Sequence, residues 1–265
     1  MRTANIACAT SIATRATAAL LLALAVPGAA GAQAQDRPPN PDPAFPFARE
    51  IEAFAKANAK SPPVDGATLF LGSSSIRLWD IAASFTDIPT VNRGFGGAST
   101  PDVLRYYRRL LPPIEPRTIV VYVGENDLAA GASPDRVTTD ILTLLKRLRS
   151  DYPRAAIAFL SLKPSPIRWT LWSKMAAVNQ AIAHRAAKER FTFLDVGSLL
   201  LARDGLPDAS LFRPDGLHMN PRGYQRWTRL VDNWLDHATQ MARSRHPDAK
   251  CDKKGLLSHP IALSD

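Results

Sequence analysis

Apolar residues fall into two alternating patterns between residues 47 and 240. Short continuous apolar runs are typical of strands buried on both faces, and apolar residues every three or four positions are typical of amphipathic helices. The short runs predict strands at residues 67–71, 88–91, 118–123, 155–162 and 191–196. The helical pattern predicts helices at residues 47–60, 100–111, 134–150, 173–189 and 220–240. Strands that alternate with helices indicate an α/β fold, a three-layer sandwich with a central parallel sheet of about five strands and helices on both faces.

The two ends of the chain differ from this central region. Arg2 and Arg15 precede an apolar stretch at residues 18–26, and small residues follow this stretch up to Ala32 and Ala34. This order is typical of a secretory signal peptide cleaved after Ala32 or Ala34, with a buried N-terminal helix as the less favoured alternative. The expected organisation is a signal peptide at 1–32, a proline-rich linker at 33–46, one domain at 47–241 and a loose tail at 242–265. We therefore expect export through a Sec-type signal, to the periplasm or the outside of the cell.

Composition narrows the class of protein further. The chain has 265 residues, of which 46% are hydrophobic and 22% charged, so general disorder is excluded. Two cysteines are too few for a disulfide framework or a zinc cluster. The net charge of +9 loses two arginines with the signal peptide and becomes +7, and this surplus is dispersed along the chain. A dispersed surplus favours a solvated basic face over a nucleic-acid site, with at most weak association with anionic surfaces.

Polar segments with reactive or hydrogen-bonding side chains follow the first three predicted strands, and a fourth such segment precedes the last helix. They are Gly72–Ile76, Asn92–Thr100, Gly124–Asp127 and Asp215–His218. Ligands and substrates of open parallel sheets bind beyond the carboxyl ends of the strands. We therefore expect these four segments to meet at one edge of the sheet.

Together the four segments supply the groups that acyl transfer requires. Ser74 can act as the nucleophile if a base accepts its proton, and the imidazole of His218 suits that role. Asp215 lies three residues before His218 and can orient the ring. The amides of Ser74 and Gly97 and the side chain of Asn126 can stabilise the oxyanion of a tetrahedral intermediate. This set needs neither a metal nor a cofactor.

The order and spacing of these segments resemble the conserved blocks of the SGNH hydrolases, also called GDSL-like lipases and esterases. The resemblance covers about residues 67–235 and departs from the family pattern at Ser73, where the family has aspartate, so the substrate stays open. It implies a flavodoxin-like arrangement of the three-layer sandwich. The residues it assigns are Ser74 as nucleophile, Asp215 and His218 as its partners, and Ser74, Gly97 and Asn126 as the oxyanion hole, with Gly96 as the alternative to Gly97.

These observations predict a secreted serine esterase that hydrolyses small or short-chain acyl esters, acetylated sugars included, through an acyl-enzyme on Ser74. Arg168 and Trp169 follow the fourth strand and are candidates for substrate binding, unless they form a rigid packed loop. A lysophospholipase or thioesterase is the alternative, with Arg168 on a headgroup and the acyl chain along Trp169. A catalytically inactive module that binds glycan or lipid is the third possibility. The α/β-hydrolase elbow is excluded because Ile76 stands where that motif needs glycine.

Overall fold

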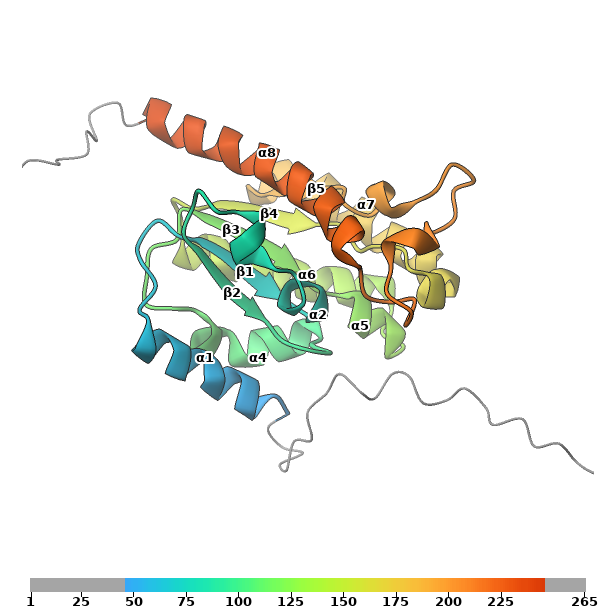
Figure 1. Cartoon of the computed structure of the whole chain (residues 1–265), viewed down its shortest axis with the longest axis horizontal. Coiled ribbons are helices and arrows are strands. Elements are labelled where there is room, and N and C mark those ends of the chain that lie inside the picture. Colours follow the sequence, from blue (N-terminus) through green and yellow to red (C-terminus); the bar gives the residue numbers. More distant parts are fainter. Residues whose placement is uncertain (1–45, 246–265) are drawn as a thin grey trace, which may run out of the picture.

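Five parallel strands form the centre of the structure, a computed structural model that describes residues 46–245 (Figure 1). The expected signal peptide at 1–32, all but the last residue of the linker at 33–46 and most of the tail at 242–265 lie outside these residues. The strands are β1 (Thr68–Gly72), β2 (Thr90–Gly94), β3 (Thr118–Tyr122), β4 (Ala156–Leu160) and β5 (Thr192–Leu194). They lie in the order β2-β1-β3-β4-β5. The predicted α/β sandwich with a five-stranded parallel sheet is therefore confirmed.

Five long helices cover the sheet, close to where the sequence predicts them. They are α1 (Ala48–Lys60), α4 (Thr100–Leu110), α6 (Pro134–Asp151), α7 (Trp172–Glu189) and α8 (Pro221–Arg245). Short helices of one or two turns lie between them: α2 (Ser74–Arg77), α3 (Ile81–Ser84), α5 (Glu125–Ala129) and the 3₁₀-helices η1 (Pro166–Leu171), η2 (Ser198–Leu200) and η3 (Ala209–Leu211). The sequence did not predict these short helices because one or two turns are too short to show a helical period.

The strand order decides which helices cover which face. From β1 the chain steps to β2 on one side, whereas β3, β4 and β5 follow one another on the other side. Because parallel crossovers are right-handed, α2 and α3 lie on one face and α4, α6 and α7 on the other. Figure 1 shows α8 along one face of the sheet and α1 and α4 along the opposite face. Trp79, which follows α2, packs against Tyr224 and Trp227 of α8 with ring centroids 5.8 and 5.7 Å apart.

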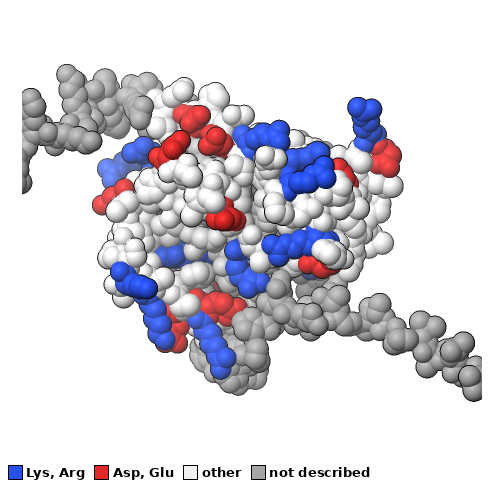
Figure 2. Space-filling model, viewed as in Figure 1, with Lys and Arg blue, Asp and Glu red and all other residues white. Residues whose placement is uncertain are grey.

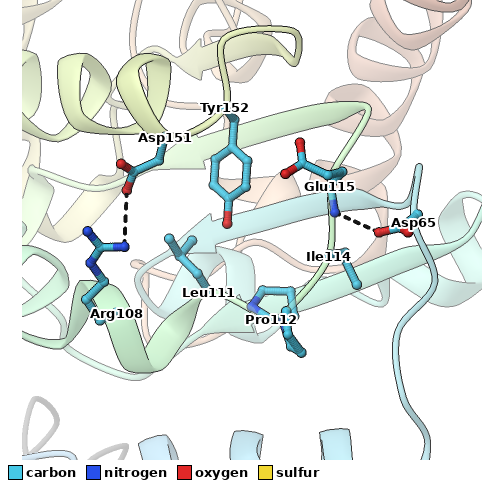
Figure 3. Close-up of a pocket in the computed structure, with 9 residues that line it drawn as sticks. Asp65, Arg108, Leu111, Pro112, Ile114, Glu115, Asp151 and Tyr152 are labelled. Atoms are coloured by element: carbon cyan, nitrogen blue, oxygen red, sulfur yellow. Dashed lines mark hydrogen bonds and ion pairs between the residues drawn. The ribbon is translucent and has the colours of Figure 1, made fainter.

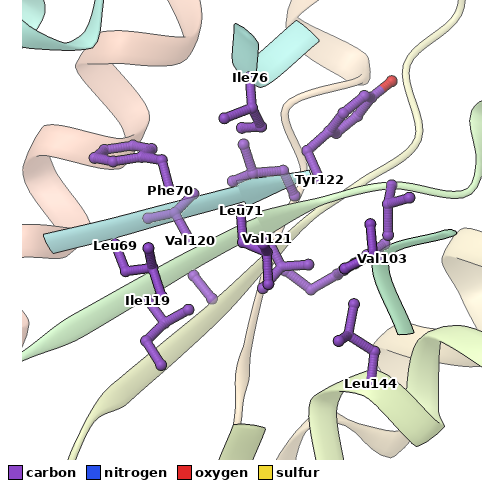
Figure 4. Packing of buried hydrophobic residues seen from close by; sticks show 14 of the residues in the cluster. Leu69, Phe70, Leu71, Ile76, Val103, Ile119, Val120, Val121, Tyr122 and Leu144 are labelled. Carbon is purple, nitrogen blue, oxygen red and sulfur yellow. The ribbon is translucent and has the colours of Figure 1, made fainter. Parts of the chain in front are cut away.

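Both faces of the sheet are buried, which explains the continuous apolar runs of its strands (Figure 4). Phe70 of β1 stacks on Phe85, with centroids 5.3 Å apart, and Tyr122 of β3 contacts Trp227 at 5.0 Å. Side chains alternate between faces along a strand, so Leu69 and Leu71 point to the opposite layer. No helix among the described residues is long and apolar enough to cross a membrane.

The second strand differs from its prediction, because β2 begins two residues later than expected and ends at Gly94. The polar residues Asn92 and Arg93 therefore belong to the strand. Arg93 is 5% exposed, its Nε donates to the carbonyl of Leu110 at 3.1 Å, and its guanidinium lies over the ring of Phe54. Burial lowers the pKa of Arg93 to about 10. These contacts compensate for the burial of a charge on an edge strand. A prediction from continuous apolar runs does not include such a charged residue in the strand.

Candidate active site

Three side chains from two distant parts of the sequence form a hydrogen-bonded chain at the carboxyl edge of the sheet. Nε2 of His218 lies 3.0 Å from Oγ of Ser74, and Nδ1 of His218 lies 2.7 Å from Oδ2 of Asp215. His218 is buried, with 7% of the residue exposed, while Ser74 is half-buried. This is the geometry in which an imidazole can take the serine proton while a carboxylate holds the ring.

Ser74 is presented by a sharp turn from β1 into α2. A Cβ atom at Gly72 would lie 1.9 Å from the carbonyl oxygen of Tyr122, so only glycine fits where β1 ends beside β3. The amide of Ser73 donates to the same carbonyl at 3.1 Å and anchors the turn. Ser74 then begins α2, where its amide has no acceptor one helical turn earlier.

A tight turn before α8 holds the histidine and the aspartate together. Oδ1 of Asp215 accepts hydrogen bonds from the amides of Leu217 at 2.9 Å and of His218 at 3.0 Å. Partial burial raises the pKa of Asp215, but the hydrogen bonds from the His218 ring and the two amides outweigh it, and the net pKa is lowered. Asp215 is therefore an ionised, fixed acceptor for the imidazole at neutral pH.

The groups expected to form an oxyanion hole follow three neighbouring strands. Ser74 follows β1, Gly97 follows β2 and Asn126 follows β3, and the sheet order puts β1 between the other two. Gly97 is exposed and has a φ of 73°, a left-handed conformation that glycine adopts without strain. Within residues 46–245, no hydrogen bond takes up the amide of Ser74 or of Gly97. Nδ2 of Asn126 donates to the carbonyl of Ala98 at 2.9 Å, which leaves its second N–H.

Asp127 lies next to this site but has a different set of contacts. It is buried, and both of its carboxylate oxygens accept a hydrogen bond from the amide of Thr100, at 3.0 and 3.1 Å. Burial raises the pKa of Asp127 against the opposing effect of these bonds. Asp127 thus ties α5 to the first residue of α4.

A buried cluster of charged side chains lies next to Asn126 and was not predicted from the sequence. Glu125 accepts hydrogen bonds from Nζ of Lys163 at 2.8 Å, from the hydroxyl of Tyr122 at 2.5 Å and from Nη1 of Arg168 at 3.2 Å. The pKa of Glu125 is raised by burial but lowered more by Lys163 and Arg168, so that the net shift is downward. Burial lowers the pKa of Lys163, with Glu125 opposing the shift. Opposite charges directly after two neighbouring strands were the available signal in the sequence.

The two residues expected to bind substrate lie in η1 but have different surroundings. Nη1 of Arg168 also donates to Oδ1 of Asn126 at 3.0 Å, and its side chain is only 12% exposed. Trp169 is half-buried and stacks on Trp172, with ring centroids 6.0 Å apart and planes 14° from parallel. Arg168 thus contacts the protein's own site residues, whereas part of the Trp169 surface faces solvent.

A hollow of about 490 Å³ lies at the opposite edge of the sheet and is separate from this site (Figure 3). Its lining includes Asp65, Arg108, Asp151 and Tyr152, which precede strands or end helices at the amino end of the sheet. On the face of the molecule seen in Figure 2, Lys and Arg are interspersed with Asp and Glu.

Comparison with protein families identifies the class to which this fold and site belong. Residues 77–226 match the model of the GDSL-like Lipase/Acylhydrolase family. Because the match covers more than half of the chain, the protein belongs to this family, and the membership predicted from the motifs is confirmed. The match begins three residues after Ser74 and includes Asn126 and His218. Family membership supports a general function as an ester hydrolase.

Three solved structures with the same fold are distant in sequence from this chain. A protein described as a platelet activating factor from Streptococcus pneumonia is 22% identical with a TM-score of 0.64, over 71% of this chain and 92% of that chain. One described as an acylhydrolase from Bacteroides fragilis is 20% identical with a TM-score of 0.61, over 70% and 95%. A GDSL-like lipase from Bacteroides thetaiotaomicron is 18% identical with a TM-score of 0.59, over 71% and 98%. No curated protein matches the chain significantly.

Proposed function

We propose that the protein is a serine esterase that hydrolyses carboxylic esters through an acyl-enzyme on Ser74. The observation that supports this most is the continuous chain from Ser74 through His218 to Asp215, with distances of 3.0 and 2.7 Å. In the first half-reaction, Nε2 of His218 takes the proton of Ser74 while Oγ forms a bond to the ester carbonyl carbon. The bond to the leaving oxygen then breaks, and His218 returns the proton to the leaving alcohol.

The second half-reaction repeats these steps with water. His218 takes a proton from water, the hydroxide oxygen bonds to the acyl carbon, and the proton passes to Oγ as the acid leaves. In both halves the carbonyl oxygen becomes an anion. The amides of Ser74 and Gly97 and the second N–H of Asn126 are the proposed donors to it.

Small or short-chain acyl esters are the proposed substrates. The chain passes through one residue from β1 into α2 and through two residues from β3 into α5, which leaves little length there for a lid or a covered acyl tunnel. A buried tunnel would gain about 0.8 kcal/mol for each methylene, and a shallow open site gains much less. The half-exposed surface of Trp169 can accept a short acyl group or the face of an acetylated sugar. Arg168 is occupied by Glu125 and Asn126, so it does not support the lysophospholipase alternative.

The Ser74→Ala variant tests the proposed reaction. We expect hydrolysis of nitrophenyl esters to fall by about 10⁶ in kcat, because the hydroxyl that forms the covalent bond is gone. Ser75→Ala is the matched control, because this neighbouring serine has a buried side chain outside the hydrogen-bonded chain and should keep most of the activity. A covalent serine reagent should label only the peptide that contains Ser74. Substantial activity in folded Ser74→Ala would contradict the proposal.

Chain length tests the substrate. On the wild-type protein, kcat/KM should be highest for acetyl to butyryl esters and should fall for longer chains. A rate that climbs steadily to palmitoyl, or that jumps above the micelle threshold, would favour a lysophospholipase.

A further inference from the structure

The amide of Asn126 is held in one orientation by two contacts on opposite sides. Its Nδ2 donates to the carbonyl of Ala98 at 2.9 Å, and its Oδ1 accepts from Nη1 of Arg168 at 3.0 Å. A flipped amide would turn its NH₂ group toward the guanidinium and its oxygen toward a carbonyl oxygen. Both contacts would then be repulsive, because donor would face donor and acceptor would face acceptor. Arg168 and Ala98 therefore fix the direction in which the free N–H of Asn126 points.

Arg168 is itself held in place by the buried charges beneath it. The same Nη1 donates to Oε1 of Glu125 at 3.2 Å, while Oε2 of Glu125 accepts from Lys163 at 2.8 Å. The side chains of Arg168, Glu125 and Lys163 are 12%, 5% and 1% exposed. The cluster carries two positive charges and one negative charge, so one positive charge remains beside the Asn126 amide.

Such a cluster requires a reason beyond stability. Buried ion pairs can often be replaced by apolar side chains without loss of stability, because removing charges from water costs as much as their attraction returns. A cation on Oδ1 does two things that an apolar residue cannot do. It fixes the direction of the amide, and it polarises the amide so that the remaining N–H is a stronger donor. Both effects favour an anion that forms in front of Nδ2.

We propose that Arg168 is a positioning residue that acts through Asn126: it fixes and polarises the amide that donates to the oxyanion, and it does not contact the substrate. This inference rests on the proposed serine esterase function. It assigns Arg168 a role different from the substrate binding expected from the sequence, and the two roles differ in their kinetic effects. A positioning residue changes kcat and needs Asn126 to do so, whereas a substrate-binding residue changes KM whether or not Asn126 is present.

A double-mutant cycle distinguishes these roles. We would measure kcat and KM on neutral nitrophenyl acetate for the wild type, Arg168→Gln, Asn126→Ala and the double variant. Arg168→Gln should lower kcat by about tenfold or more, within the roughly 10² to 10³ that one lost oxyanion donor costs, with KM nearly unchanged. In the Asn126→Ala background, the same substitution should have almost no further effect.

Two further variants keep the test decisive. Arg168→Lys retains the positive charge that Glu125 needs, so the cycle can be repeated with it if Arg168→Gln does not fold. We then expect a smaller loss in kcat that again disappears in the Asn126→Ala background. Arg185→Gln removes an exposed arginine of α7 that pairs with Glu189, and it should leave kcat and KM unchanged.

Losses that multiply in the double variant, or an effect of Arg168→Gln on KM alone, would overturn the positioning role. These outcomes would leave the serine esterase function intact, because Ser74→Ala tests that function separately. A wild-type protein without any Ser74-dependent hydrolysis would overturn both.

Discussion

Glu125→Gln is the substitution that tests the buried charge cluster most directly. The change keeps the size of the side chain but removes the negative charge from between Lys163 and Arg168. Glu125 accepts three hydrogen bonds from Tyr122, Lys163 and Arg168, and its side chain is only 5% exposed. A glutamine oxygen can accept from one side only, so its NH₂ group must face a donor. Two cations would then remain buried with no anion beside them.

The expected cost follows from this geometry. Removing one partner of a buried ion pair typically destabilises a protein by about 3 to 5 kcal/mol. For a domain of this size, 1 kcal/mol lowers the melting temperature by roughly 2 to 4 °C. Glu125→Gln should therefore lower Tm at pH 7 by about 6 to 20 °C.

The effect should also depend on pH with a definite sign. The pKa of Glu125 is raised by burial but lowered more by Lys163 and Arg168, so in the folded protein it lies below its ordinary value of 4.5. A lowered pKa stabilises the fold fully above the unfolded value, and this stabilisation is lost as pH falls through the folded value. The difference in stability between wild type and Glu125→Gln should therefore be largest near neutral pH and should shrink below about pH 4.5.

Both expectations can be tested by thermal unfolding monitored with circular dichroism from pH 3 to pH 7. Glu52→Gln is the matched control, because Glu52 is 59% exposed and pairs with Lys56 on the surface of α1. We expect Glu52→Gln to change Tm little, because exposed ion pairs contribute little to stability. If Glu125→Gln melted within 2 °C of the wild type at pH 7, the buried cations Lys163 and Arg168 would not need the negative charge of Glu125.

The remaining predictions concern the proposed reaction and the core. His218→Ala should lower kcat by about 10⁶, while Asp215→Asn should cost about 10⁴, measured by steady-state kinetics. Equal losses in the two variants would instead indicate a structural role for the whole turn. Asn126→Ala should lower kcat by roughly 10² to 10³ with little change in KM or Tm, and a kinetic loss that tracked Tm would exclude an oxyanion role. Trp227→Ala should destabilise the fold by about 3 to 5 kcal/mol in urea unfolding, because Trp227 is fully buried.

Strong local patterns explain which elements the sequence could predict. The apolar runs of β1 and β3 predicted these strands to within one residue at each end, because both strands are buried on both faces and most of their side chains are apolar. The candidate site residues Ser74 and Asn126 were predicted for a related reason. Each follows such a strand, and parallel strands bring the segments after them to one edge.

The features that the sequence did not predict depend on contacts between distant segments. The extension of β2 includes Arg93, whose Nε donates to the carbonyl of Leu110, 17 residues later. The role of Arg168 depends on its contacts with Glu125 and Asn126, about 40 residues earlier in the chain. A periodicity reports how much of a segment is buried, but it does not report which partner satisfies a buried charge. Arg168 therefore looked like an exposed residue available to substrate.

The aromatic core links the stability of the fold to the spacing of the proposed active site. Ser74 begins the segment that leads to Trp79, and the turn that holds His218 leads into α8 and to Trp227. These two tryptophans pack together at 5.7 Å, and the hydroxyl of Tyr224 donates to the carbonyl of Ser75 at 3.0 Å.

Both contacts lie within nine residues of the groups that must meet, so they hold the two segments at a fixed separation. The distance of 3.0 Å between Ser74 and His218 is thus a consequence of core packing as much as of their own hydrogen bond. We therefore expect a substitution in this core to lower the rate of the reaction before it unfolds the domain. A small shift of the imidazole is enough, because an error of about 1 Å in the position of a reacting group can cost about 10² in rate.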